Sequence, residues 1–248
     1  MVIRSDGSSR LHTDLRDSQL IDDGTPEMDS LPDHNGLKSK QRALREKFHI
    51  NLSLRVHRAL SWLDRADKCD DDDADAQFIF LWIAFNAAYA EDLGQVTPDA
   101  SRNLFRAYFE KLIPLDQDRR IYNALWTRFS GPIRLLLDNK FVYHRFWSHH
   151  NGVPGHDDWE QKFSIARQQA QSALASQNTL IVLTTLFDRL YVLRNQLMHG
   201  GATWNSTVNR AQVRDGAAIL AFLIPLFIDL MMDNPNLPWG KPNYPVIP

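Results

Sequence analysis

Apolar residues recur every three or four positions along most of the chain, which is the spacing of an α-helix with one buried face. Over residues 39–66 this pattern predicts one amphipathic helix. Residues 77–93 are apolar almost all round, so we expect them to form a central helix. Asn86 is the only polar residue between Gln77 and Tyr89 in that helix. A buried amide has to find hydrogen-bond partners, which makes Asn86 a candidate functional residue.

Further helices are predicted between residues 97 and 232, and no segment shows the alternation of a β-strand. Thr97 and Pro98 mark one start, because Pro is favoured at the first helical position. The helix from Asn178 to His199 closes on Gly200, a common C-terminal stop. The other predicted helices cover residues 116–129, 132–137, 157–176 and 206–232, and residues 141–159 form an irregular stretch rich in histidine and aromatic residues. The predicted fold class is an all-α helical bundle.

The two ends of the chain differ from this pattern. Residues 1–36 are polar, with scattered Gly, Ser, Asp and Pro, so we predict a mobile N-terminal tail. Residues 37–232 then form one helical domain, in which residues 94–176 are helices and a histidine/aromatic loop inserted between the core helices. Residues 233–248 carry five prolines and are predicted to be an extended C-terminal strap.

Composition narrows the classes of partner. The net charge of −2 over 248 residues gives no general attraction to polyanions, so RNA has to be held by a local group of arginines. Cys69 is the only cysteine and the first thirty residues contain no apolar secretory segment, which together favour a cytoplasmic location. The most apolar run, residues 217–232, is interrupted by Pro225 and Asp229. Its uncharged part is shorter than the roughly 20 residues of a membrane span, so a core helix is expected.

The helix over residues 178–199 is predicted to have two different faces, because successive residues advance by about 100°. Its apolar face carries Leu183, Leu186, Phe187, Leu190, Leu193 and Leu197. Its polar stripe carries Thr184, Asp188, Tyr191, Asn195 and His199. The polar stripe therefore ends in an asparagine and a histidine, at the point where the chain reads "LRNQLMHGG".

Arg194 projects from the border of the apolar face, where an unpaired guanidinium is costly. Two interpretations follow from the residues alone. Arg194 forms a permanent ion pair with Glu91 or Asp92 of the central helix, or it reaches a phosphate shared with His199. The pattern does not choose between them.

Arg194, Asn195 and His199 together suit the cleavage of RNA without a metal. Histidine titrates near neutral pH and can take the proton of a ribose 2′-hydroxyl. A forked arginine stabilises the charge that develops on the phosphoryl oxygens, and an amide orients the phosphate or the imidazole. One copy of the motif lacks a second acid or base. Two copies facing each other across a twofold axis supply both.

The sequence Arg-Asn-x-x-x-His near the end of an apolar helix resembles the HEPN superfamily (higher eukaryotes and prokaryotes nucleotide-binding). Its hallmark is an Arg followed four to six residues later by a His, matched here by Arg194, Asn195 and His199. The upstream segment "LWIAFNAAYAEDL" is similar to the second helix of the prokaryotic Apea-like HEPN groups. The resemblance covers about half of the chain, residues 78–93 and 178–232.

The resemblance implies a helical bundle that dimerises through the motif helix and acts as a metal-independent endoribonuclease, with no cofactor. The products would carry a cyclic phosphate, and the substrate would be an RNA, with tRNA among the candidates. Many members are toxins or phage-defence effectors, which implies an antitoxin or defence partner. Some members are catalytically inactive modules that bind RNA or a protein, and this is the alternative function. Asp188, Asn86 and Tyr191 are candidates to support the site.

Other groups of residues suggest further hypotheses. Arg210, Arg214 and Trp204 follow the motif closely in sequence and are candidate substrate contacts. The histidines and acids of residues 144–158 raise the hypothesis of a metal-dependent hydrolase, although their spacing fits no closed metal pattern. The aromatic and cationic residues of the same stretch suit the stacking of unpaired bases, or packing against the bundle. The acidic run "CDDDDAD" is interpreted as a helix cap rather than a metal-binding loop.

Overall fold

The computed structural model describes residues 33–90, 98–207, 209–242 and 244. Every element that these residues form is helical, so the prediction of an all-α bundle is confirmed. The α-helices are α1 (His34–Leu44), α2 (Ile50–Ala66), α3 (Ala74–Tyr89), α4 (Pro98–Leu112), α5 (Arg120–Asn123), α6 (Ser130–Leu137), α7 (His144–His150), α8 (Trp159–Ala175), α9 (Thr179–Met198) and α10 (Arg210–Asp233). Short 3-10 helices are η1 (Arg45–Lys47), η2 (Ile113–Leu115) and η4 (Lys140–Val142), and η3 (Ala124–Arg128) is a π-helical turn.

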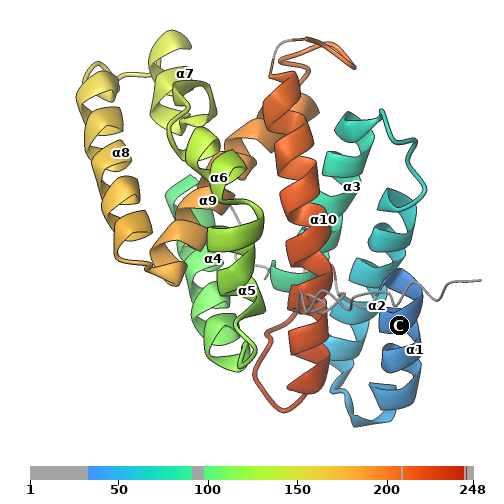
Figure 1. Ribbon diagram of the computed structural model, residues 1–248. Coiled ribbons are helices and arrows are strands. Elements are labelled where there is room, and N and C mark those ends of the chain that lie inside the picture. The colour runs from blue at the N-terminus through green and yellow to red at the C-terminus, as the bar shows by residue number, and fades with distance from the viewer. Residues whose placement is uncertain (1–32, 91–97, 208, 243, 245–248) are drawn as a thin grey trace, which may run out of the picture. The chain divides into compact units, whose positions relative to one another are not determined.

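Helix α10 runs through the middle of the bundle, with α1–α3 on one side and α4–α9 on the other (Figure 1). Helices α2 and α3 pack against each other along their length, and both contact α10, while α4 packs on α9. Gly216 allows α10 to approach α3 closely, because a Cβ at this position would lie 2.7 Å from the ring of Phe78. The core is one continuous cluster that draws on all of the longer helices.

Helix α10 is long and apolar enough to cross a membrane, judged by length and composition, and 72% of its most apolar window is buried in the bundle. Asp229 lies within it at 4% exposure. Its carboxylate meets the Lys40 ammonium at 2.5 Å and the Arg120 guanidinium at 3.1 Å. The charge that interrupts the apolar run is therefore paired with cations from α1 and α5, and in this fold α10 is a core helix.

A second buried charge fixes the C-terminal segment. Arg55 on α2 has no exposed surface, and its guanidinium donates to five backbone carbonyls. Three belong to the last turn of α3 and the residue after it, and two belong to the C-terminal segment: Ala87, Ala88, Ala90, Gly240 and Lys241. A cation at a helix C-terminus also suits the helix dipole. Trp239 in the same segment is 5% exposed and belongs to the core cluster, so the segment is held to the bundle at residues 239–241, while a strap over all of residues 233–248 stays a prediction.

Three sequence predictions need correction. Residues 39–66 do not form one helix, because the backbone is extended at Phe48 and His49 caps α2. The apolar spacing continues across this break, since α1 and α2 both bury a face against the same core. Residues 141–159 are less irregular than expected, because they include helix α7. The N-terminal boundary at residue 36 also shifts: Asp33 caps α1 by accepting from the Gly36 amide at 2.7 Å, while residues 1–32 lie outside the described residues.

Candidate active site at the end of helix α9

Helix α9 begins and ends where the sequence predicts. The Asn178 side chain caps its start by accepting from the Ile181 amide at 3.1 Å. His199 is its C-cap residue, and Gly200 follows in the left-handed region at φ 68°, where glycine is favoured. The motif therefore occupies the last turn and a half of a helix whose apolar face is buried in the core.

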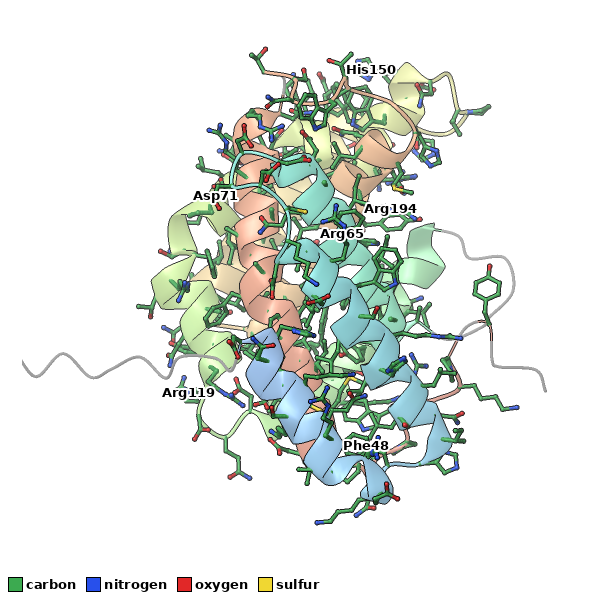
Figure 2. The ribbon with its side chains drawn as sticks, turned by 90° about the vertical axis from the view of Figure 1, so that its right-hand side faces the viewer. Phe48, Arg65, Asp71, Arg119, His150 and Arg194 are labelled. Carbon is green, nitrogen blue, oxygen red and sulfur yellow. The ribbon has the colours of Figure 1, made fainter. Side chains whose placement is uncertain are left out.

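Arg194 and Asn195 form a pair inside this last turn. The Arg194 Nη1 donates to Asn195 Oδ1 at 2.9 Å, and both side chains are half-buried. Within the described residues Arg194 makes no ion pair, and Glu91 and Asp92, its other candidate partners, lie outside them. Figure 2 shows Arg194 on the same half of the bundle as His150, with Arg119 and Phe48 towards the opposite end.

His199 is exposed at the end of the helix. It lies five residues after Arg194, which corresponds to about 7.5 Å along the axis and about 140° around it in a regular helix. The geometry of one chain therefore separates the imidazole from the guanidinium around the helix. Met198, beside His199, is 49% exposed, and Trp204 is 72% exposed. Large apolar side chains thus lie on the surface on both sides of His199 in the sequence.

Aromatic rings from three helices support Arg194. The guanidinium lies 6.0 Å from the ring centroid of Tyr191, which itself lies 6.1 Å from Trp82 of α3 and 6.2 Å from Phe105 of α4. Burial raises the pKa of Tyr89 well above its usual range, against a smaller lowering by the positive charge of Arg194. Because the Tyr191 ring packs on Trp82 and Phe105 and lies 6.0 Å from the guanidinium, it holds Arg194 by packing and by cation–π attraction.

Sequence analysis missed Gln196, which ties the motif to two other elements. Its Nε2 donates to the Phe141 carbonyl at 2.6 Å, and its Oε1 accepts from Asn209 Nδ2 at 3.0 Å. Its own carbonyl accepts from the Gly201 amide at 2.7 Å. Gln196 thereby connects the end of α9 to η4 and to the start of α10. No sequence signal marks it, since its partners lie 55 and 13 residues away.

The same Phe141 carbonyl also accepts from Trp147 Nε1 at 2.7 Å. The structure therefore brings the histidine/aromatic stretch next to the motif through η4 and α7. Phe146 is buried at the centre of this stretch, between Trp159 and the stacked ring of His150. Within the described part of the chain, no three His, Cys, Asp or Glu side chains come close enough to hold a metal ion.

The candidate substrate contacts after the motif are placed differently from one another. Arg210 Nη1 lies 2.5 Å from Asp75 Oδ2, and both side chains are nearly buried, so its guanidinium serves the fold instead of facing solvent. Trp204 is exposed, but its Nε1 donates to Asp73 Oδ1 at 3.2 Å at the cap of α3. Arg214 is exposed one turn further along α10. Of the three, Arg214 alone presents an exposed cation.

The supporting residues are also spread out. Asn86 is half-buried on α3, and Asp188 is half-buried eleven residues before His199, about 16 Å along the axis. The predicted polar stripe of α9 does not face solvent along its whole length, because Thr184 is buried in the core at 6% exposure. Asp188 therefore belongs to a different part of α9 from His199.

Next to Asp188 lies Arg189, a second residue that the sequence pattern did not single out. It is 1% exposed, and its guanidinium carbon lies 4.6 Å from the ring of Tyr143 and 5.8 Å from that of Phe163. Its Nε and Nη1 are buried, and no described residue forms a hydrogen bond with either. Desolvation lowers the pKa of Arg189, partly offset by the negative charge of Asp188.

Two surface pockets, of about 600 and 430 Å³, lie apart from the motif. The larger is formed by the start of α2 and residues 235–241, and the smaller by α6 and α8. Neither is lined by Arg194, Asn195 or His199. The site is therefore an exposed helix end and not the floor of one of these pockets.

Comparison of the chain with protein-family models, with curated proteins and with solved structures gives no match. The likeness to the HEPN superfamily consequently rests on Arg194, Asn195, His199 and the α3 sequence themselves.

Proposed function

We propose that the protein is a metal-independent endoribonuclease of the HEPN type, acting in the cytoplasm, whose site is completed by two copies of the chain. The observation that carries the proposal is the placement of the motif. His199 is exposed at the end of α9, and one turn earlier Arg194 is held by Asn195 and the Tyr191 ring. A group that must exchange protons with a substrate is thus open to it, and a cation in a fixed position lies about 7.5 Å away along the axis of the same helix.

The chemistry needs one base and one acid, and each chain supplies one imidazole. His199 of one chain takes the proton of the ribose 2′-hydroxyl, whose oxygen forms a bond to phosphorus. His199 of the partner subunit gives a proton to the 5′-oxygen as the P–O5′ bond breaks. The products are a 2′,3′-cyclic phosphate and a 5′-hydroxyl. Acid–base catalysis of this kind contributes roughly 10²–10⁴ in rate.

Arg194 stabilises the negative charge that develops on the phosphoryl oxygens in this step. Asn195 Oδ1 accepts a hydrogen bond from one guanidinium nitrogen of Arg194 and thereby fixes the direction of the guanidinium. Asn195 therefore acts through Arg194 as a positioning residue. The second Arg194 of the dimer supplies a further cation to the same phosphate.

The surface around His199 supports pairing of two chains. Met198 and Trp204 expose large apolar side chains on either side of it in the sequence. Exposed apolar groups rimmed by polar residues are typical of protein interfaces. A twofold interface that includes the end of α9 would cover them and bring two His199 side chains together.

The test is an RNA cleavage assay with total tRNA and ribosomal RNA, with and without EDTA. Wild type is expected to cleave in EDTA, whereas Arg194→Ala and His199→Ala lose the activity by at least about 100-fold. Arg45→Ala and His57→Ala, exposed on other elements, are the matched controls and should cleave normally.

Two other outcomes assign a different function. RNA that stays intact while binding is retained identifies a catalytically silent binding module. Cleavage that EDTA abolishes identifies a metal-dependent hydrolase. A toxin or phage-defence role predicts in addition that wild type inhibits growth on expression and that His199→Ala does not.

A further inference from the structure

The Arg189 guanidinium is a buried charge with incomplete hydrogen bonding. Two of its three nitrogens have no hydrogen-bond partner among the residues that the structure describes, and the rings of Tyr143 and Phe163 provide cation–π attraction. Burying a charge without hydrogen bonds is costly, and an apolar side chain of similar size is usually as stable or more stable at such a position. An anion that reached the guanidinium would supply the missing hydrogen-bond acceptors.

Further cations surround the same place. Arg102 at the start of α4 and Arg145 on α7 both act electrostatically on Tyr143, together with Arg189 and Asp188. Arg102 is exposed, and Arg145 has 39% of its side chain exposed, with Asp158 at 3.9 Å. The charges of three arginines from α4, α7 and α9 thus act on Tyr143, and the Arg189 guanidinium carbon lies 4.6 Å from its ring. Two carboxylates act against them: Asp158 lies 3.9 Å from Arg145, and the charge of Asp188 acts on Tyr143.

The cluster lies on the motif helix itself. Arg189 precedes Arg194 by five residues, about 7.5 Å along the axis. The two arginines also lie about 140° apart around the axis, so an RNA strand with one phosphate at Arg194 reaches this cluster by passing around the helix. Arginine is well suited to this role, because its planar fork binds two phosphate oxygens at once.

We propose that Arg189, Arg102 and Arg145 form a second phosphate-binding subsite around Tyr143, which holds the RNA backbone beside the cleavage site. Arg102 and Arg145 attract the phosphate from the surface, and the Arg189 fork closes on it from behind Tyr143. The subsite extends the proposed function by assigning a binding role to the helices between α3 and α9. It rests on RNA as the ligand and not on the cleavage step.

The experiment measures binding of a fluorescently labelled single-stranded RNA by the full chain carrying His199→Ala, which prevents cleavage. Arg189→Met in this background is expected to weaken binding about tenfold or more at constant salt, from the loss of a bidentate charged contact. Its thermal midpoint should be equal to that of the parent or higher. Unchanged affinity, or RNA that does not bind the parent, overturns the proposal.

If Arg189→Met does not fold, substitutions of the two arginines nearer the surface test the subsite. Arg102→Gln and Arg145→Gln should each reduce the slope of log affinity against log salt by about 1. Arg106→Gln is the matched control, because Arg106 lies one turn further along α4 and pairs with Glu110 at 2.9 Å. A slope for Arg102→Gln and Arg145→Gln equal to that of Arg106→Gln contradicts the subsite.

Binding and cleavage separate this proposal from the nuclease proposal. RNA binding that depends on Arg189, without cleavage by wild type, supports the subsite and rules out the nuclease proposal. Cleavage by wild type, together with normal RNA binding by the Arg189→Met chain, rules out the subsite alone.

Discussion

Arg55 and Arg189 are both buried arginines, but their surroundings differ completely. Arg55 donates to five backbone carbonyls at 2.8–3.5 Å, which include the last carbonyls of α3 and two of the C-terminal strap. Arg189 lies against two neighbouring aromatic rings, and two of its nitrogens have no hydrogen-bond partner within the described part of the chain. The first guanidinium is satisfied by the fold itself. The second is not, and it lies on the helix that carries the motif.

The difference separates a structural charge from a binding charge. A saturated buried guanidinium holds segments of the same chain together, and its removal leaves carbonyls without donors. An unsaturated one costs stability as long as its ligand is absent. Arg210 is intermediate between these cases, since its Nη1 pairs with Asp75 while its Nε and Nη2 form no hydrogen bond with a described residue.

The largest stability effect is expected for Arg55→Met. The variant removes every donor to the five carbonyls, so the free energy of unfolding should fall by about 3 kcal/mol or more. Urea denaturation followed by circular dichroism measures it. Arg65→Met is the control on the same helix, where the guanidinium is exposed and lies 4.5 Å from the Phe80 ring, and it should cost less than about 1 kcal/mol.

An intermediate effect is expected for Asp75→Asn. The Asp75 carboxylate accepts from Arg210 and, at 3.0 Å, from the Asn205 amide, so the neutral amide loses the ion pair and weakens the second bond. The free energy of unfolding should fall by about 1–2 kcal/mol in the same assay. Asp71→Asn, in the exposed loop before α3, should change it by less than about 0.5 kcal/mol. Equal effects of the two changes would mean that the Arg210 pair does not stabilise the fold.

The smallest effect on stability is expected for Arg189→Met. The free energy of unfolding should stay within about 1 kcal/mol of wild type or rise, because two of the guanidinium nitrogens have no partner among the described residues. The same denaturation series gives the value. A loss as large as that of Arg55→Met would show that the two arginines play the same structural part, and the distinction between them would fail.

The motif helix and its caps follow from local sequence. Asn178, the apolar spacing and Gly200 define α9 to within a residue, because capping and helix periodicity act between near neighbours. Because such local signals do not mark the break between α1 and α2, the sequence analysis missed it. The spacing continues across it, and the turn at Phe48 is set by packing of α1 against α2 and α10.

Long-range partners explain the residues of the site that the sequence did not indicate. Arg189 looks like an ordinary charge until Tyr143 and Phe163 are placed over it by helices from the inserted region. Gln196 is unremarkable until the Phe141 carbonyl lies against it. Arg210 was expected to face substrate because it follows the motif closely, whereas its partner Asp75 is 135 residues away in sequence.

Mixing active and inactive chains tests the two-chain site most directly. Wild-type chain at a fixed concentration is equilibrated with increasing amounts of the His199→Ala chain, and RNA cleavage is measured in EDTA. If each site needs His199 from both chains, a ninefold excess of the variant leaves about one tenth of the rate, because most wild-type chains are then in mixed dimers. A cleavage rate that does not change with added His199→Ala chain would contradict the account.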